Sequence, residues 1–184
     1  MASCGSSSYV RMWRGASTAM TDVVLDSGPL IHLSELDALD VICDFSSLFI
    51  PEAVRDEVGR HQPAALKHSF NLHVISAPSP QATIRILART LSLDRGELEA
   101  LSLMELHPHA IFLTDDSAAR VAADQRGFKV HGTIGILIRA VRKGHRTGPE
   151  VIDILRSLPR RSTLYIKPSL LNEIISSLAN EWQV

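Results

Sequence analysis

Short apolar runs bounded by polar residues recur along the chain and predict buried strands. They lie at about residues 23–25, 48–50, 72–75, 110–113 and 128–130. The first, second and fourth are almost wholly apolar, which is typical of strands buried on both faces of a parallel sheet. The run at 72–75 is also compatible with an extended connection. The pattern therefore predicts a sheet of up to five short strands.

Between these runs, apolar residues recur at helical spacing. Pro51 and Gly59 bound one such segment, Pro108 follows another and Gly127 a third, as expected where helices start and stop. Helices are expected at about residues 29–45 (as two short helices), 51–59, 81–90, 98–106, 117–125, 132–141, 150–157 and 169–180. Strands that alternate with helices over residues 22–146 predict an α/β fold, a three-layer α/β/α sandwich with a mainly parallel central sheet.

The Gly148-Pro149 dipeptide suggests a boundary near residue 147. We therefore expect an α/β domain over residues 21–146 and a C-terminal helical extension, residues 147–184, packed on the domain. Residues 1–20 contain no acidic residue and no apolar core of signal-peptide length. Their composition is compatible with an organellar transit sequence, but a tag or an extension upstream of Met20 is the preferred interpretation. We expect them to be disordered.

The composition narrows the class of protein. The chain has 184 residues, of which 45% are hydrophobic, so we expect a folded globular protein with one ordinary domain. No apolar run approaches the roughly 18 residues that a bilayer span needs, which argues against a membrane protein. The two cysteines, Cys4 and Cys43, do not make a disulfide framework, so the reducing cytoplasm is the expected location.

The net charge of −1 hides an uneven distribution. Residues 1–116 hold 8 Lys+Arg and 15 Asp+Glu, whereas residues 117–184 hold 11 Lys+Arg and 5 Asp+Glu. An acidic half and a basic half can place a cation site beside a surface that attracts polyanions. The alternative, that these charges interleave in space and cancel, stays open on charge alone.

Two of the predicted strands end in carboxylates. The run at 110–113 is followed by Thr114, Asp115 and Asp116, and the run at 23–25 is followed by Asp26. Ligands bind at the carboxyl ends of the strands in open parallel sheets. Adjacent carboxylates repel each other there unless a cation joins them, and oxygen ligands suit Mg²⁺ or Mn²⁺. Helix capping by Asp26 or Asp116 is the structural alternative, although one helix start uses one cap.

Two glutamates lie on the rims of apolar helix faces. Glu57 shares a face with Val54 and Val58, and a carboxylate there needs a partner, either a metal ion or an arginine. Glu97 occupies the same kind of position on its own helix. The spacing of Asp94 and Glu97 is also that of a capping box. Together with the acids at the strand ends, the two glutamates are expected to converge on one cleft.

Other chemistry has little support. The His107-Pro108-His109 segment lacks the cysteine partners and the spacing of a zinc site. Neither a Gly-x-Gly-x-x-Gly nor a Gly-x-x-x-x-Gly-Lys loop is present, which argues against a nucleotide-cradling loop. The order of the acids also differs from that of a receiver domain, in which an acid pair lies near the first strand.

Four segments of the chain occur in a distinctive order. They read VLDSGPLI from residue 24, IPEAVRDEV from residue 50, GELEA from residue 96 and LTDDSAAR from residue 113. In this order they resemble the PIN domain, most closely the prokaryotic branch akin to the toxin nucleases of toxin–antitoxin pairs. The resemblance covers about residues 22–180. It implies a metal-dependent endoribonuclease that uses Mg²⁺ or Mn²⁺, with a homodimeric state and an antitoxin partner as further expectations.

The resemblance also assigns roles to individual residues. The implied catalytic acids are Asp26, Glu57, Glu97 and Asp116, and the implied metal ligands are Asp26, Glu97, Asp115 and Asp116, of which Asp115 is extra to the family's quartet. Ser27 and Thr114 match hydroxyl positions beside the metal. Gly28 departs from the pattern, because the family usually has a second hydroxyl residue there, which affects fine positioning.

Basic residues of the second half are the candidates for holding an RNA backbone, namely Arg120, Arg139, Arg142, Lys143 and Arg146. An apolar stripe on the last helix, from Leu170 to Leu178, could seat a second copy, but core packing is the preferred interpretation. The alternative function is a non-catalytic PIN-like scaffold that binds RNA or protein.

Overall fold

Five parallel strands form the centre of the computed structural model, which describes residues 21–67 and 71–183. They are β1 (Val23–Leu25), β2 (Leu48–Pro51), β3 (Leu72–Ile75), β4 (Ile111–Leu113) and β5 (Lys129–His131). The order in the sheet is β3-β2-β1-β4-β5, and every neighbouring pair is parallel. The predicted α/β fold is confirmed, and the run at 72–75 is a strand at the edge of the sheet.

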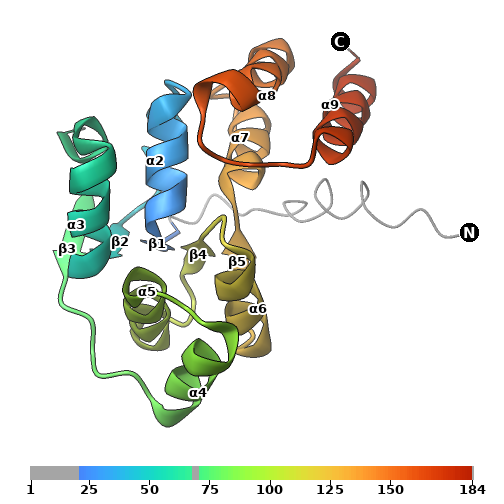
Figure 1. Ribbon diagram of the computed structural model, residues 1–184. Coiled ribbons are helices and arrows are strands. Elements are labelled where there is room, and N and C mark those ends of the chain that lie inside the picture. Colours follow the sequence, from blue (N-terminus) through green and yellow to red (C-terminus); the bar gives the residue numbers. More distant parts are fainter. Residues whose placement is uncertain (1–20, 68–70, 184) are drawn as a thin grey trace, which may run out of the picture.

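Helices cover both faces of this sheet, which gives three layers (Figure 1). On one side lie α2 (Ser27–Glu35), α3 (Glu52–His61), α7 (Thr133–Arg142), α8 (Gly148–Arg161) and α9 (Pro168–Trp182). On the other side lie α4 (Ala82–Leu91), α5 (Arg95–Leu106) and α6 (Ser117–Gln125). Two short 3₁₀ helices, η1 (Leu39–Ile42) and η2 (Pro63–Lys67), follow α2 and α3.

The strands are buried on both faces, because successive side chains point to opposite sides of a sheet. Val23 and Leu25 belong to the apolar core under α2, α7 and α8, whereas Val24 belongs to the core under α4, α5 and α6. In β4, Leu113 and Phe112 divide in the same way. This two-sided burial explains why the strands read as apolar runs and not as alternating patterns.

Among the helix boundaries that differ from those expected, two are the start of α5 and the end of α8. Helix α5 begins at Arg95, three residues before its first apolar residue, because Asp94 and Glu97 form a capping box that fixes the start. Helix α8 continues to Arg161 and includes Pro159 in its last turn, whereas the pattern predicted an end near residue 157. Proline lacks the N–H of a helical hydrogen bond, but the rest of the turn continues past it.

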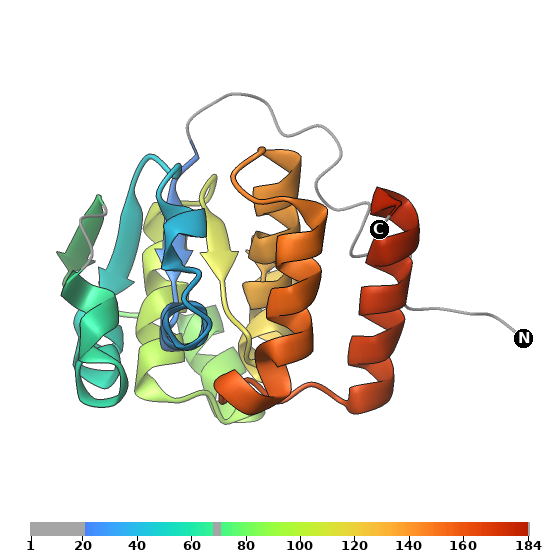
Figure 2. The ribbon, with the colours of Figure 1, turned by 90° about the horizontal axis from the view of Figure 1, so that it is seen from above.

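The C-terminal helices pack on the domain. Leu171, Ile174 and Leu178 of α9 are buried in the same core as β1, so the stripe on this helix is core packing, as preferred above. Gly148 at the start of α8 lies against the Trp182 ring, where an added Cβ would be 2.9 Å from a ring carbon. Figure 2 shows α8 and α9 running in opposite directions beside α7. No helix within residues 21–67 and 71–183 is long and apolar enough to cross a membrane.

Candidate active site at the carboxyl edge of the sheet

Asp26 and Thr114 meet at the carboxyl ends of the two central strands. Because β1 and β4 pair in parallel, with Leu25 opposite Leu113, the next residue of each strand reaches the same edge. The Asp26 N–H donates to the Leu113 carbonyl at 2.9 Å, and the Thr114 hydroxyl donates to Asp26 Oδ2 at 2.8 Å. The Ser27 N–H donates to Asp26 Oδ1 at 2.8 Å. Both oxygens of the carboxylate are therefore oriented.

The Asp26 carboxylate is in an unfavourable electrostatic position. The residue is only 5% exposed, and burial raises its pKa to about 6, from 3.8. The hydrogen bonds from Thr114 and Ser27 oppose this shift, whereas the negative charges of Asp94 and Glu57 add to it. A buried carboxylate with further carboxylates around it is stabilised by a bound cation.

Glu97, at the start of α5, interacts electrostatically with this carboxylate. It completes the capping box, in which the Asp94 N–H donates to Glu97 Oε2 at 2.8 Å and the Glu97 N–H donates to Asp94 Oδ1 at 2.9 Å. Burial raises the pKa of Glu97 to about 7, and the charges of Asp94, Asp116 and Asp26 add to the shift. The capping alternative raised by the sequence is thus confirmed, yet the same side chain belongs to the acidic group.

Glu57 joins the group from α3. Val54 and Val58 are buried and Glu57 is half-buried, as the helical spacing predicted. A Cβ added at Gly96 would lie 3.5 Å from Glu57 Oε2 and 3.4 Å from Val54 Cγ2, so α3 and α5 are close here. A cleft of about 600 Å³ opens between the two helices, and Glu57 and Asp94 line it. Sequence reasoning treated Asp94 only as a cap.

Asp116 is held as the N-cap of α6. Its Oδ1 accepts hydrogen bonds from the N–H groups of Ala118 and Ala119 at 2.7 and 2.8 Å. Its own N–H donates to the Thr114 hydroxyl oxygen at 3.2 Å, so Thr114 links Asp116 to Asp26. The structure therefore brings the predicted acids Asp26, Glu57, Glu97 and Asp116 into one electrostatic group, with Thr114 and Ser27 in contact with Asp26.

Asp115 points into a different set of donors. Its Oδ1 accepts from the Thr133 N–H at 2.8 Å, and its Oδ2 accepts from the Thr133 hydroxyl at 2.5 Å. His32 Nδ1 lies 2.8 Å from the same Oδ2. A Cβ at Gly132 would be 2.6 Å from Asp115 Oδ1, so only glycine allows this close approach. Asp115 ties α2, β4 and α7 together, and the structure does not place it with the acidic group.

The space around residue 28 does not require a glycine. A Cβ added there would lie 3.5 Å from His32 Cε1 and 3.6 Å from the Asp115 Cβ, which is ordinary van der Waals contact. The missing hydroxyl at this position is therefore a difference in hydrogen bonding, and not a consequence of crowding.

The acidic group has no basic partner in the part of the chain that the structure describes. No ion pair there joins Asp26, Glu57, Glu97 or Asp116 to an arginine or a lysine. Nor do the described residues contain three or more His, Cys, Asp or Glu side chains already arranged to hold a metal ion. The acids thus interact electrostatically but do not form a finished ligand cage.

Most of the predicted RNA-binding residues lie elsewhere. Arg139 is buried, donates through both terminal nitrogens to Asp44 and packs on the Phe45 ring, so it is not available to RNA. Arg146 pairs with Asp40, and Arg142 lies 3.8 Å from Glu181. These residues and Lys143 follow the direction of α7, which begins beside Asp115 and extends about 15 Å away from it. Arg120, on α6, is the predicted basic residue that stays near the acids.

The donor set determines what this site can bind. Carboxylate and hydroxyl oxygens are the ligands of hard divalent cations, and the acidic group contains no sulfur or imidazole donor. A divalent cation between Asp26, Glu97 and Asp116 would offset the loss of hydration on burial, which raises the pKa of the first two, and the repulsion that adds to it. The residues present therefore fit Mg²⁺ or Mn²⁺.

Comparison with known proteins gives one family. A family model of the PIN domain matches residues 22–181, which is most of the chain. No curated protein matches the chain.

Proposed function

The chain belongs to the PIN-domain family, whose members are generally nucleases, and we propose that it is a metal-dependent endoribonuclease. The substrate of the proposed reaction is the phosphodiester backbone of RNA, and water is the nucleophile. The proposed active site is the acidic group at the carboxyl edge, composed of Asp26, Glu57, Glu97 and Asp116.

In this proposal Asp26, Glu97 and Asp116 hold one or two Mg²⁺ or Mn²⁺ ions. Bound divalent ions supply an activated water and neutralise charge on the phosphate oxygens during hydrolysis. Asp115 stays a predicted ligand from the sequence, but its hydrogen bonds to Thr133 and His32 favour a structural role.

The chain's own groups prepare this site. The Thr114 hydroxyl and the Ser27 N–H fix the two oxygens of Asp26, so this ligand needs little reordering on binding. Glu97 and Asp116 are held at helix N-termini, whose N–H groups partly offset their charge. Glu57 faces the cleft between α3 and α5, where it can accept a proton from water or orient it.

One observation carries the proposal. Two carboxylates from different segments, Asp26 and Glu97, have raised pKa values because they are buried beside other carboxylates, and the described residues give them no basic partner. Strongly perturbed pKa values are a mark of functional sites. A purely structural cluster would be expected to contain an arginine or a lysine.

The direct test is cleavage of RNA by the purified protein. A panel of single-stranded RNAs should be degraded in Mn²⁺ and left intact in EDTA, and Asp26→Asn should reduce the rate by at least about 100-fold. The matched control is Asp124→Asn, which changes an exposed aspartate on the far part of α6 and should cleave like the wild type. Equal activity in Asp26→Asn and the wild type would assign the cleavage to a contaminant or another site.

A non-catalytic scaffold is the alternative, favoured by the hydrogen bonds that hold Glu97 and Asp116 in helix caps. It predicts RNA or protein binding without cleavage in any divalent metal. A role as a toxin, an antitoxin partner and a homodimer are further parts of our proposal that rest on the sequence resemblance alone. A cytoplasmic location is also part of it and rests on the low cysteine content.

A further inference from the structure

An extended segment between α8 and α9 presents one aromatic and one basic side chain to solvent. Along residues 162–167 half-buried and exposed positions alternate, as in a strand. Leu164 and Ile166 pack against the core, while Tyr165 is 83% exposed and Lys167 is exposed beside it. A tyrosine held open in this way is unusual, because large aromatic rings are normally buried or used in contacts.

The segment is fixed and not merely a loose connection. Glu35, at the end of α2, accepts hydrogen bonds from the Ser162 hydroxyl at 2.8 Å and from the Thr163 N–H at 2.7 Å. The Leu164 N–H donates to the Ser162 hydroxyl oxygen at 3.2 Å. These contacts set the register that turns Leu164 inward and Tyr165 outward.

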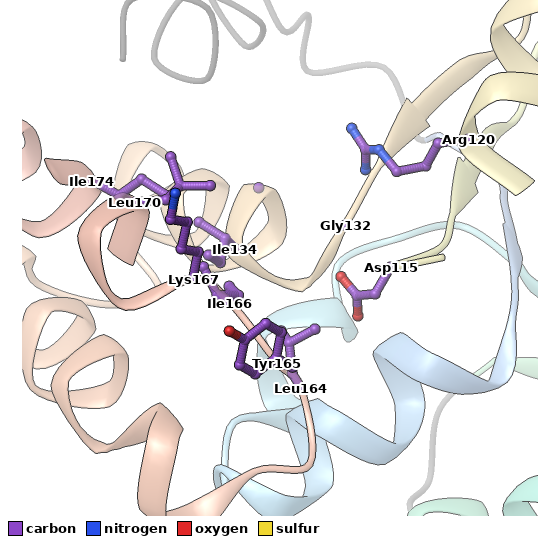
Figure 3. A pocket seen from close by; sticks show the side chains of 11 residues that line it. Asp115, Arg120, Gly132, Ile134, Leu164, Tyr165, Ile166, Lys167, Leu170 and Ile174 are labelled. Atoms are coloured by element: carbon purple, nitrogen blue, oxygen red, sulfur yellow. The ribbon is translucent and has the colours of Figure 1, made fainter. Parts of the chain in front are cut away.

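Tyr165 and Lys167 form one side of a pocket of about 230 Å³. Figure 3 shows Arg120 and Asp115 across the pocket from Lys167, with Ile134 and Leu170 on the side of α7 and α9. We call this space the Tyr165 pocket. Its wall combines an aromatic ring, apolar side chains and two cations.

The charge of the Tyr165 pocket favours an anionic occupant. Arg120 and Lys167 form no ion pair within residues 21–67 and 71–183, although Arg120 donates to the Thr114 carbonyl at 3.4 Å. The acid in the wall, Asp115, already accepts hydrogen bonds on both oxygens. The two cations are therefore open to a ligand, whereas the carboxylate is already satisfied.

The pocket also borders the proposed active site. Arg120 lies one turn along α6 from Asp116, and Asp115 is the residue before Asp116. Arg120 therefore links the pocket, which it lines, to the start of α6, which Asp116 caps. Because the carboxyl edge is negative without metal, a polyanion gains a favourable path to it only where cations flank the acids.

We propose that the Tyr165 pocket binds one nucleotide of a single-stranded RNA next to the bond that is cut, with the base stacked on Tyr165 and the backbone phosphates held by Arg120 and Lys167. Aromatic stacking combined with basic side chains is the usual means of holding a single strand. This inference rests on the proposed ribonuclease function, and it identifies the nucleotide that positions the RNA for cleavage.

The test measures RNA binding separately from cleavage. A fluorescein-labelled eight-nucleotide single-stranded RNA is titrated with the full chain in EDTA, and the dissociation constant is read from fluorescence anisotropy. Tyr165→Ala should weaken binding by roughly 5- to 100-fold, while Tyr165→Phe, which keeps the ring, should bind within about twofold of the wild type. Because Tyr165 is exposed, neither variant should change the unfolding midpoint.

Charge is tested by a matched pair of lysines. Lys167→Gln should weaken binding and reduce the slope of log affinity against log salt by about 0.7, because one phosphate contact is lost. Lys67→Gln removes the same charge at an exposed position of η2, away from the Tyr165 pocket, and should leave both quantities unchanged. Leu106→Ala, which removes an exposed apolar side chain elsewhere, is the control for Tyr165→Ala.

The outcomes separate this inference from the ribonuclease proposal. Binding that depends on Tyr165 without any cleavage supports the pocket and contradicts the ribonuclease. If Tyr165→Ala binds and cleaves RNA as the wild type does, the proposed nucleotide site is wrong. An acidic protein segment is then the better candidate for the Tyr165 pocket. Equal losses in Lys167→Gln and Lys67→Gln also overturn it, because they indicate a diffuse charge effect.

Discussion

The two ends of the parallel sheet treat charge in opposite ways. At the end where the strands begin, Asp44 precedes β2 and receives a two-pronged ion pair from Arg139, with distances of 2.7 and 2.6 Å. At the carboxyl end, Asp26 and Glu97 are surrounded by neutral donors and other carboxylates. At one end the carboxylate is neutralised by an arginine, and at the other Asp26 and Glu97 have no basic partner among the described residues.

This difference follows from the β–α topology. Each helix that follows a strand starts at the carboxyl edge, where acidic N-caps interact favourably with the helix dipole. Asp26 and Asp116 cap α2 and α6 in this way, and Asp94 caps α5, which follows α4. Helix capping is therefore compatible with the proposed metal binding by the same carboxylates, because the caps hold the acids in place without a metal.

The largest expected effect comes from the Asp44–Arg139 ion pair, at the end of the sheet where the strands begin. Arg139→Leu leaves Asp44 without its partner in a mostly buried place and should lower the free energy of unfolding by about 3 to 4 kcal/mol. Although burial alone would raise the pKa of Asp44, Arg139 holds it below its ordinary value, which shows how strongly the pair is coupled. Urea unfolding at pH 7 measures the change.

The matched control for Arg139→Leu is Arg156→Leu, in an exposed pair with Asp153 on α8. It should change the free energy of unfolding by less than about 0.5 kcal/mol. A double variant that also replaces Asp44 with leucine should recover part of the loss. Equal small effects in both single variants would show that Arg139 is not structural and would return it to the candidates for RNA contact.

The sequence predicts the carboxyl edge better than it predicts the basic surface. Parallel strands bring residues that follow them to one edge, so the positions of Asp26 and Asp116 follow from the strand pattern alone. The basic residues near the end of α7 follow no such rule. A count of charges along the chain does not show that Arg139 meets Asp44, which lies 95 residues away in sequence.

The tertiary partners of Asp115 were equally hidden in the sequence. Its contacts with His32 and Thr133 depend on the close approach of Gly132, which is a property of the folded backbone. Tyr165 was missed for a related reason. A single tyrosine between two apolar residues gives no periodic signal over so short a segment, and its exposure depends on the register that Glu35 sets.

At the carboxyl end of the sheet, removing the charge of Asp26 should stabilise the protein. The pKa of Asp26 is raised in the folded state, so ionisation destabilises the fold, and stability should fall as pH rises from about 4 to about 6. Asp26→Asn removes this penalty and should raise the free energy of unfolding by about 2 kcal/mol at pH 8 in EDTA. At pH 4, where Asp26 is largely protonated in the fold, the two proteins should differ little.

The Asp124→Asn protein is again the control for this measurement, and it should show the stability and the pH dependence of the wild type. Some pH dependence should persist in Asp26→Asn at pH 5 to 7, because the pKa of Glu97 is raised to about 7. If Asp26→Asn is instead less stable than the wild type at pH 8, a positively charged group must already stabilise the Asp26 carboxylate in the absence of metal.

The smallest expected effect is the stabilisation of the wild type by Mn²⁺. At a free Mn²⁺ concentration ten times the dissociation constant, linkage gives about 1.4 kcal/mol, seen as a rise in the unfolding midpoint over the EDTA sample. The gain should shrink at pH 5.5, because Asp26 and Glu97 must lose their protons before they can bind a metal.

Glu97→Gln distinguishes a site from a general effect of divalent ions, since it removes one carboxylate of the acidic group and should lose most of the shift at pH 8. Asp124→Asn should keep the shift. If the wild type, Glu97→Gln and Asp124→Asn respond alike, Mn²⁺ binds elsewhere. The acidic group would then serve only to cap helices. If none responds at millimolar Mn²⁺, the scaffold alternative gains over the ribonuclease, because the acids then repel one another without the ion that would explain their position.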